Sequence, residues 1–398
     1  MKVFNFINFW KAGIPMIISM VLQALYNIID TAFVINMGPI LGEKANLALT
    51  YAFPIQIFMI ALGVGTGIGI NALLSRYLGE NNEKEIKKTV LNSLYIMILI
   101  YALFVIIGVF LSEPFIRMQS NGDQDVIDMG RDYLFIVCVF SLGNVGQFVA
   151  WGLAVLFHII FNKEIKTDFK NFKPDIKCIG AIYKIGWSAA VMQALLSIMM
   201  LGMNIIFKYS HYDSELLQGT FGIYYKIQQI PLFACFGMSN CLITLTAFVY
   251  GTKDTKRLKE VIKYGIIDTC IVGLIITILF EIFASQISEV FGLAGGGTSE
   301  EIINACVLAI RIASISYVFM AFTIGIQGIL QGLRNAVSPL ILSLLRLCVF
   351  IFPIAYTFTY LKNVVTFVWI TFIISEFLTS IISFIVIKKN VNVNIKNK

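Results

Sequence analysis

The sequence predicts an all-α polytopic membrane protein, and three observations indicate this fold class. Hydrophobic residues make up 58% of the 398 residues and charged residues only 13%, whereas soluble domains are roughly 45–50% apolar and 25% charged. The mean hydropathy is +0.84. Ten apolar runs are long enough to cross a bilayer, and basic residues alternate between abundant and scarce from one loop to the next.

The ten apolar runs predict ten helical spans, because a membrane-crossing helix needs roughly 20 residues. No short apolar segment with a small-residue cleavage site precedes the first run, so we expect that run to be an uncleaved span. In chain order the runs are 12–37, 50–74, 90–111, 133–161, 179–207, 220–250, 264–284, 302–333, 336–361 and 364–387.

Loop charges predict the orientation of these spans. Of the 30 lysines and arginines, 22 fall in loops on one side of the predicted membrane and five on the other. Membrane proteins collect Lys and Arg in cytoplasmic loops, so we expect a multi-pass protein of the cell (plasma) membrane with both termini in the cytoplasm. The same rule explains the net charge of +7 without a nucleic-acid partner.

The basic stretch 162–178 is the only long polar segment, and we interpret it as a cytoplasmic linker. It divides the chain into an N-terminal lobe, 1–161, with four spans and a C-terminal lobe, 179–398, with six. "FPIQIF" at Phe53 matches "YKIQQI" at Tyr225 with an offset of 172 residues, and "LGENNEKEIKK" at Leu78 matches "YGTKDTKRLKE" at Tyr250 with the same offset. The two lobes are therefore predicted to be repeats.

The repeat breaks within the first lobe. Between the matches near Val126 and Val145 the offset rises from 176 to 229 residues, so the first lobe lacks about 53 residues, which is about two spans with their loop. The run 133–161 is about 43 Å long as a helix, which is too short for two crossings. We expect one long span there, tilted or bent near Gly143 and Gly146.

A polar stripe on the first predicted helix is the main candidate site. Ser19, Gln23, Asn27 and Asp30 are spaced by four, four and three residues and so share one face. A carboxylate within the bilayer is costly and marks either a functional site or a polar seam between helices, and the sequence leaves both open. In the functional interpretation Asp30 binds H⁺ or Na⁺, with oxygens from Asn27 and Thr31.

Other polar groups inside the spans are few. Lys226 lies beside Gln228 and Gln229, and it is interpreted either as part of a site or as a side chain that extends to the interface. For five further ionisable residues we expect structural pairing between helices: Asp268, Glu281, Arg311, Arg346 and Glu376. The stretch "GVGTGIG", 63–69, has no Lys-Ser/Thr after it and predicts close helix packing instead of a phosphate loop.

Catalytic and metal-binding motifs are not found in the sequence. The seven cysteines form no C-x-x-C pair, and His158 and His211 stand apart from each other. Neither a disulfide framework nor a metal site is supported, and no nucleophile stands beside a base at a readable spacing. We therefore expect no enzyme activity and no cofactor beyond a coupling ion, H⁺ or Na⁺.

Three stretches resemble the multidrug and toxin extrusion (MATE) transporter family over nearly the whole chain. They are "GIPMIISMVLQALYNIIDTAFV" from Gly13, "AFPIQIFMIALGVGTGIGINALLSRYLGENN" from Ala52 and "GIQGILQGLRNAVSPLILSLLR" from Gly325. The resemblance implies a MATE-like two-lobe helical bundle, with about ten transmembrane helices here instead of twelve. It also implies export of cationic, often aromatic drugs by alternating access in exchange for H⁺ or Na⁺.

By resemblance Asp30 matches the family's acidic residue on the first span, which is implicated in cation coupling. The candidate substrate-cavity residues are Gln23, Tyr26, Gln56, Lys226, Gln228 and Gln229. Family members usually carry a further Asn and Asp on a fifth span facing that carboxylate, and the 53-residue gap removes this span.

Two alternatives follow from the departure. In the first, the chain is a transport-deficient deletion variant, with a partner or dimer compensating for the missing spans. In the second, it is a flippase for lipid-linked sugars from the same superfamily. The first predicts no ethidium efflux above background, and the second predicts a cell-wall phenotype without drug resistance.

Overall fold

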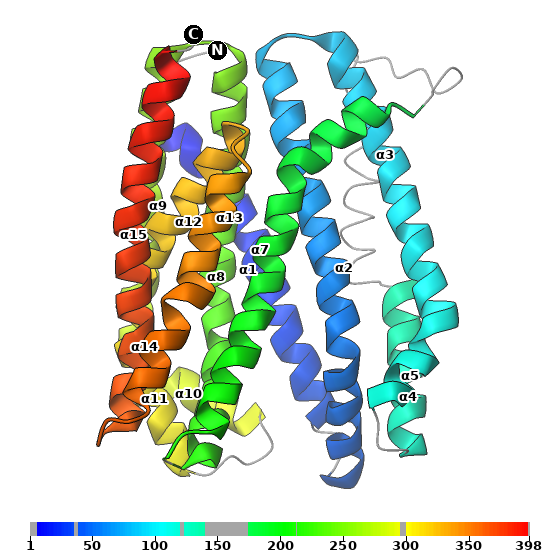
Figure 1. The fold of residues 1–398 in the computed structure, drawn as a ribbon, viewed down its shortest axis with the longest axis vertical. Coiled ribbons are helices and arrows are strands. Elements are labelled where there is room, and N and C mark those ends of the chain that lie inside the picture. The colour runs from blue at the N-terminus through cyan, green and yellow to red at the C-terminus, as the bar shows by residue number, and fades with distance from the viewer. Residues whose placement is uncertain are drawn as a thin grey trace.

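The computed structural model is a bundle of long helices (Figure 1). It describes residues 6–35, 39–119, 123–139, 174–211, 213–294 and 300–396, and in these ranges every regular element is helical. The first-lobe elements are α1 (Phe6–Ile35), α2 (Pro39–Gly79), α3 (Glu83–Ile106), the π-helix η1 (Ile107–Leu111), α4 (Ser112–Gln119) and α5 (Gln124–Val139).

The second lobe contributes a longer series of helices. Its elements are α7 (Ile176–Lys208), α8 (Ser214–Gly251), α9 (Thr255–Ile282), α10 (Ala284–Ala294), α11 (Glu300–Ser314), α12 (Tyr317–Gly332), α13 (Val337–Leu344), the π-helix η2 (Leu345–Val349), α14 (Ile351–Phe358) and α15 (Val364–Lys396). The predicted all-helical membrane fold is confirmed.

By length and hydropathy, seven helices of the described chain qualify as membrane spans, or eight if α11 and α12 form one bent span. The two other predicted spans are covered only in part. In α1 the apolar segment is Gly13–Leu25, which is shorter than a full span. The run 133–161 begins on α5, but everything after Val139 lies outside the described residues, as do Gly143, Gly146, most of the linker 162–178 and the predicted break in the repeat.

Two predicted spans are interrupted for local reasons. The run 302–333 forms α11 and α12, which meet at an angle of 53°. At this bend Ser316 Oγ donates to the Ala313 carbonyl (2.6 Å), and hydroxyls that bond to the backbone in this way bend helices. The run 336–361 contains the π-helix η2, where Phe350 N donates to Leu345 O (3.0 Å). Pro353 has no N–H, so it cannot donate the α-helical hydrogen bond to the carbonyl of Val349, four residues earlier.

The lobes meet on glycine backbones. A Cβ on Gly65 of α2 would lie 2.7 Å from the Gly186 carbonyl oxygen of α7, and a Cβ on Gly186 would overlap the Gly65 carbonyl. Gly69 lies equally close to Ile182 of α7. The predicted packing role of 63–69 is therefore confirmed for Gly65 and Gly69, since only the absence of a side chain permits this approach.

The repeat is visible in matched contacts 172 residues apart. Gly65 of α2 packs on α7, and its counterpart Gly237 of α8 packs on the backbone of α1 at Met16 and Ile17. Gly79 at the end of α2 lies against Gly251 at the end of α8. In Figure 1, α1 and α7 lie between the α2–α5 group and the α8–α15 group.

The turns that follow α2 and α8 also match. Asn81 and Lys253 both have a left-handed backbone, with φ of 51° and 59°. The next residue in each turn caps the following helix: Asn82 Oδ1 accepts from Glu85 N (3.3 Å), and Asp254 Oδ1 accepts from Arg257 N (3.0 Å). Such caps satisfy the free N–H groups at a helix start. The end of α15 lies at the same end of the bundle as these turns (Figure 1).

Ion pairs outside the spans tie the helix ends together. Lys44 of α2 lies 3.2 Å from Asp123 and 2.6 Å from Asp125 at the start of α5, and its hydrogen bond lowers the pKa of Asp123. Asp175, which caps α7, lies 2.5 Å from Lys88 of α3, and the hydrogen bond from Lys88 lowers the pKa of Asp175. Both pairs are open to water, so they orient helix ends and add little stability.

The glycine contact predicts opposite effects for one substitution at two positions of α7. Gly186→Ala should destabilise the protein by about 1–3 kcal/mol, because the added methyl group overlaps the Gly65 backbone. Gly180→Ala is the matched control, since nothing lies within 4 Å of its Cβ position, and it should stabilise by up to about 1 kcal/mol through helix propensity. Thermal unfolding of the purified variants measures both, and a Gly186→Ala protein that melts no lower than Gly180→Ala contradicts the packing assignment.

Candidate functional site

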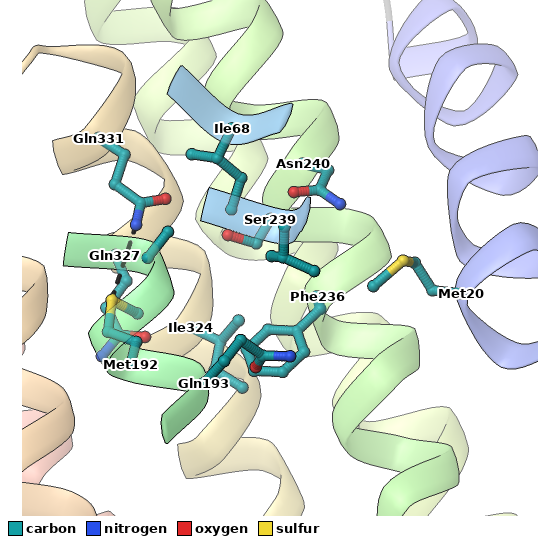
Figure 2. A pocket seen from close by; sticks show the side chains of 12 residues that line it. Met20, Ile68, Met192, Gln193, Phe236, Ser239, Asn240, Ile324, Gln327 and Gln331 are labelled. Atoms are coloured by element: carbon teal, nitrogen blue, oxygen red, sulfur yellow. Dashed lines mark hydrogen bonds between the residues drawn. The ribbon is translucent and has the colours of Figure 1, made fainter. Parts of the chain in front are cut away.

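A small pocket, with a cavity volume of about 40 Å³, lies between the two lobes. Its walls come from α1 and α2 of the first lobe and from α7, α8 and α12 of the second. The lining residues are Met20, Val64, Ile68, Ala189, Met192, Gln193, Phe236, Ser239, Asn240, Ile324, Gln327 and Gln331. Figure 2 shows Met20 extending from α1 toward the α8 side chains, with Gln193 beside the Phe236 ring. We call this space the central pocket.

The polar groups of the central pocket are uncharged. Gln327 donates to Ser343 Oγ (3.0 Å) and to the Pro339 carbonyl (3.3 Å), while its own Oε1 is buried without a hydrogen-bond partner. Gln331 Nε2 donates to the Met192 sulfur (3.7 Å), and Figure 2 marks this bond. The pocket therefore offers amide donors and acceptors, flexible thioethers and one aromatic face.

Local sequence explains how α12 presents this polar edge. Gln327 and Gln331 are four residues apart and so share one face of the helix. A Cβ on Gly328 would lie 2.7 Å from the Ser239 carbonyl oxygen, and one on Gly332 would lie 2.9 Å from the Ile243 carbonyl oxygen. These glycines bring α12 against α8, so the two amides reach the space beside it.

Gln327 and Gln331 are not among the cavity residues predicted from the sequence, although they lie in the stretch from Gly325 that resembles the MATE family. The local sequence contains a signal for such a polar edge, because the two amides stand at i and i+4 inside an apolar run, with glycines between and beside them. Gln193 and Asn240 are single polar residues in apolar helices, and nothing in their local spacing distinguishes a pocket from a helix contact.

A second small pocket, with a cavity volume of about 20 Å³, lies inside the second lobe. Gln228 and Gln229 of α8 line it, together with Arg346 of η2 and Glu376 of α15. Arg346 Nη1 lies 3.5 Å from Glu376 Oε1, and their side chains are 3% and 8% exposed. The ion pair is loose, because Arg346 Nε and Glu376 Oε2 have no hydrogen-bond partner among the described residues. We call this the second-lobe pocket.

The structure separates the residues that the sequence grouped as one cavity. Gln228 and Gln229 line the second-lobe pocket, whereas Gln56 of α2 accepts from Tyr133 OH of α5 (3.5 Å) inside the first lobe. Lys226 is half-buried on α8, and Gln23 is half-buried on α1. None of these residues lines the central pocket. Their role in substrate binding stays a prediction.

The predicted coupling residues lie on the second half of α1. Asn27, Asp30 and Thr31, like the predicted cavity residue Tyr26, belong to the helix, but their side chains are outside the described residues. Ser19, on the same predicted face, is exposed. The assignment of Asp30 as the coupling group therefore stays a prediction.

The predicted pairing of the other embedded charges has a mixed outcome. Arg346 and Glu376 pair as expected, and Glu281 of α9 accepts from Ser314 Oγ of α11 (2.7 Å). For Asp268 of α9 the prediction is wrong. This side chain is fully buried, and neither carboxylate oxygen has a hydrogen-bond partner among the described residues.

Among the described residues no group of three or more His, Cys, Asp or Glu side chains is placed to hold a metal ion. None of the seven cysteines forms a disulfide. The central pocket is lined by neutral amides, Ser239 and apolar groups, a lining that is typical of small-molecule sites.

Comparison with known proteins identifies the family. The MatE family model matches residues 15–155 and again 189–357. The multidrug export protein MepA of Staphylococcus aureus (strain MSSA476) is 20% identical over 429 residues, covering 94% of this chain and 92% of MepA. MepA of Staphylococcus haemolyticus (strain JCSC1435) is 19% identical over 410 residues, covering 90% and 88% of the two chains.

Solved structures share the fold. An outward-facing multidrug resistance MATE family transporter of the MOP superfamily superposes with a TM-score of 0.87 at 19% identity, covering 98% of this chain and 96% of that one. A MOP superfamily transporter from Pyrococcus furiosus gives a TM-score of 0.85 at 18% identity, covering 97% and 96%. Since the two family-model matches take in most of the chain, this protein belongs to the MATE family of multidrug efflux transporters.

Proposed function

We propose that this protein is a cation-coupled antiporter that exports lipophilic, aromatic and often cationic compounds by alternating access. The observation that carries the proposal is the central pocket, an uncharged, amide- and methionine-lined space between two repeated lobes. Its cavity volume in this arrangement, about 40 Å³, is far below the roughly 300–1,000 Å³ of small-molecule sites, so in our proposal the lobes move apart before a substrate enters. The names of its relatives, which are multidrug export proteins, support the same substrate class.

The composition of the pocket suits varied aromatic substrates. Met20 and Met192 have unbranched, polarisable side chains that adapt to ligands of different shape. Phe236 offers a ring face, on which aromatic cations stack favourably. No carboxylate is among the residues that line the pocket, so recognition of a cation would depend on amide oxygens and the ring, and selectivity would be broad.

The position of the pocket suits alternating access. It lies where α1 and α2 of one lobe meet α7, α8 and α12 of the other, so a rotation of the lobes would open it to either side of the membrane. In our proposal, H⁺ or Na⁺ binding at Asp30 favours one arrangement and substrate favours the other, which is the condition for exchange. We place the protein in the plasma membrane with both termini cytoplasmic, on the basis of its loop charges.

Replacing the proposed coupling group should abolish export. Cells that express Asp30→Asn are expected to retain ethidium like cells with an empty vector, because an amide cannot alternate between charged and neutral forms. Ethidium fluorescence after energisation measures this. Asp132→Asn is the matched control, since Asp132 is an exposed carboxylate paired with Arg131, and it should export like the wild type.

The outcomes separate the alternatives. Export by Asp30→Asn at the wild-type rate would contradict coupling through Asp30. A wild-type protein that exports no ethidium above the empty vector would contradict the antiporter proposal and favour the transport-deficient variant.

Removing the aromatic face of the central pocket should weaken substrate binding. Phe236→Ala is expected to lose about 1.4 kcal/mol of binding free energy, which is roughly tenfold in affinity for ethidium. Phe384→Ala is the control, because Phe384 is 56% exposed on α15 and is not among the residues that line the pocket. Fluorescence anisotropy of ethidium with purified protein measures both, and equal affinities for the two variants would remove Phe236 from the site.

A further inference from the structure

Asp268 is a buried acid that the proposed transport cycle has not yet used. It lies near the middle of α9, it is 0% exposed, and both of its carboxylate oxygens lack hydrogen-bond partners among the described residues. A carboxylate left without a partner in an apolar interior is strongly unfavourable, so such groups either find a partner or carry a proton.

The helices around Asp268 supply no opposite charge. Trp10 of α1 and Cys241 of α8 face its carboxyl group. On its own helix, Lys259 and Lys263 are exposed. Helix α11 meets α9 more than three turns away from Asp268. There Glu281 of α9 accepts a hydrogen bond from Ser314, and Arg311 of α11 is exposed.

The fourth neighbouring helix, α12, adds only one titratable side chain, Tyr317, which packs on Phe280 three turns away from Asp268. The surroundings of the acid are otherwise the apolar cluster formed by Met238, Cys241, Leu242 and Val272, with Trp10 and Ile17 packed against it. Among the described residues, the neutral Trp10 indole N–H faces the carboxyl group as a donor, but no positive charge is placed to compensate an ionised Asp268.

The cover over Asp268 comes partly from the first lobe. Helix α1 approaches α8 at Gly13, where a Cβ would lie 3.2 Å from the Met238 sulfur, and at Gly237, where a Cβ would lie 2.7 Å from the Met16 carbonyl oxygen. The groove between α1 and α9 beside this contact is lined by apolar side chains and Trp10, including Ile14, Val272 and Ile275. A movement of α1 away from α8 and α9 would therefore uncover the acid.

We propose that Asp268 is a proton-binding site that couples protonation to the packing of α1 on the second lobe. With α1 in place, the carboxyl group is neutral. When α1 moves away, water reaches the group and the proton leaves, so a rise in pH favours the separated arrangement. This inference rests on the proposed antiport and adds a site in the second lobe to the one predicted at Asp30.

The ligand is H⁺ and not a metal cation. Sodium-sized and larger ions need several oxygen ligands around them. Thr269, the neighbouring residue, uses its hydroxyl to bond the Gly265 carbonyl (2.7 Å). The other polar side chains that face Asp268 are an indole N–H and a thiol, so they supply no oxygen. The described residues thus offer one carboxyl group and no coordination shell.

Infrared spectroscopy of the full-length protein in lipid nanodiscs tests the protonation directly. The difference spectrum between wild type and Asp268→Asn at neutral pH should contain the C=O band of a neutral carboxylic acid, which the variant loses. Asp132→Asn is the control, because an exposed, paired carboxylate should contribute no such band. Absence of the band from the wild-type minus Asp268→Asn spectrum would overturn the proposal.

Hydrogen exchange tests the coupling to α1. At pH 8, peptides covering residues 10–25 should exchange faster in the wild type than in Asp268→Asn, which mimics the neutral acid and keeps α1 packed. At pH 5 the two proteins should exchange alike. Equal exchange at both pH values would overturn the coupling, and Asp268→Leu, of similar volume, supplies the same comparison if the amide variant does not fold.

The two proposals fail separately. Ethidium export by Asp30→Asn at the wild-type rate would contradict coupling through Asp30, but it would leave the carboxylic acid band and the exchange difference unchanged if Asp268 acts as proposed. An Asp268→Asn protein without either signature would leave the antiporter proposal to rest on Asp30 alone.

Discussion

Backbone contact between the lobes is the constraint on which the other features depend. Helices α2 and α7 approach until Gly65 and Gly186 touch, and α8 approaches α1 in the same way at Gly237. In a bilayer the apolar side chains gain little by leaving lipid for protein, so close van der Waals packing between small residues holds such helices together. Because these contacts are narrow and lie at the crossing points, wider space remains beside them, and the central pocket occupies part of it.

The polar groups within the bundle are satisfied to very different degrees. In the central pocket, the amide groups of Gln327 and Gln331 donate hydrogen bonds, while Gln327 Oε1 is buried without a partner among the described residues. Arg346 and Glu376 compensate each other's charge but leave several atoms unbonded. Asp268 faces the neutral indole N–H of Trp10 and the thiol of Cys241, and no opposite charge pairs with it among the described residues. A membrane protein keeps such a group at a large energetic cost, which is why we interpret it as functional and not as structural.

The repeat explains why the two contacts between the lobes resemble each other. The turns after α2 and α8 share a left-handed residue and a capping residue 172 positions apart, and the family model matches the chain twice. The contacts of α2 with α7 and of α8 with α1 are therefore equivalent. In the proposed transport cycle, a change that loosens one of these contacts has a counterpart at the other, so the lobes would rotate without breaking the core of either one.

The sequence by itself determined the fold class, the membrane spans, the repeat and the glycine faces, because hydropathy, periodicity and small-residue spacing are local signals. It also predicted structural pairing for Arg346 and Glu376, since buried charges have few other solutions, but only the structure shows that the two pair with each other. The tertiary structure alone decided which polar residues meet. Gln193, Asn240, Gln327 and Gln331 come together from three helices, and Asp268 is isolated only because α1, α8 and α12 bring no charge to it. Local sequence cannot encode such convergence, because the distance between two side chains on different helices depends on the packing of the whole bundle.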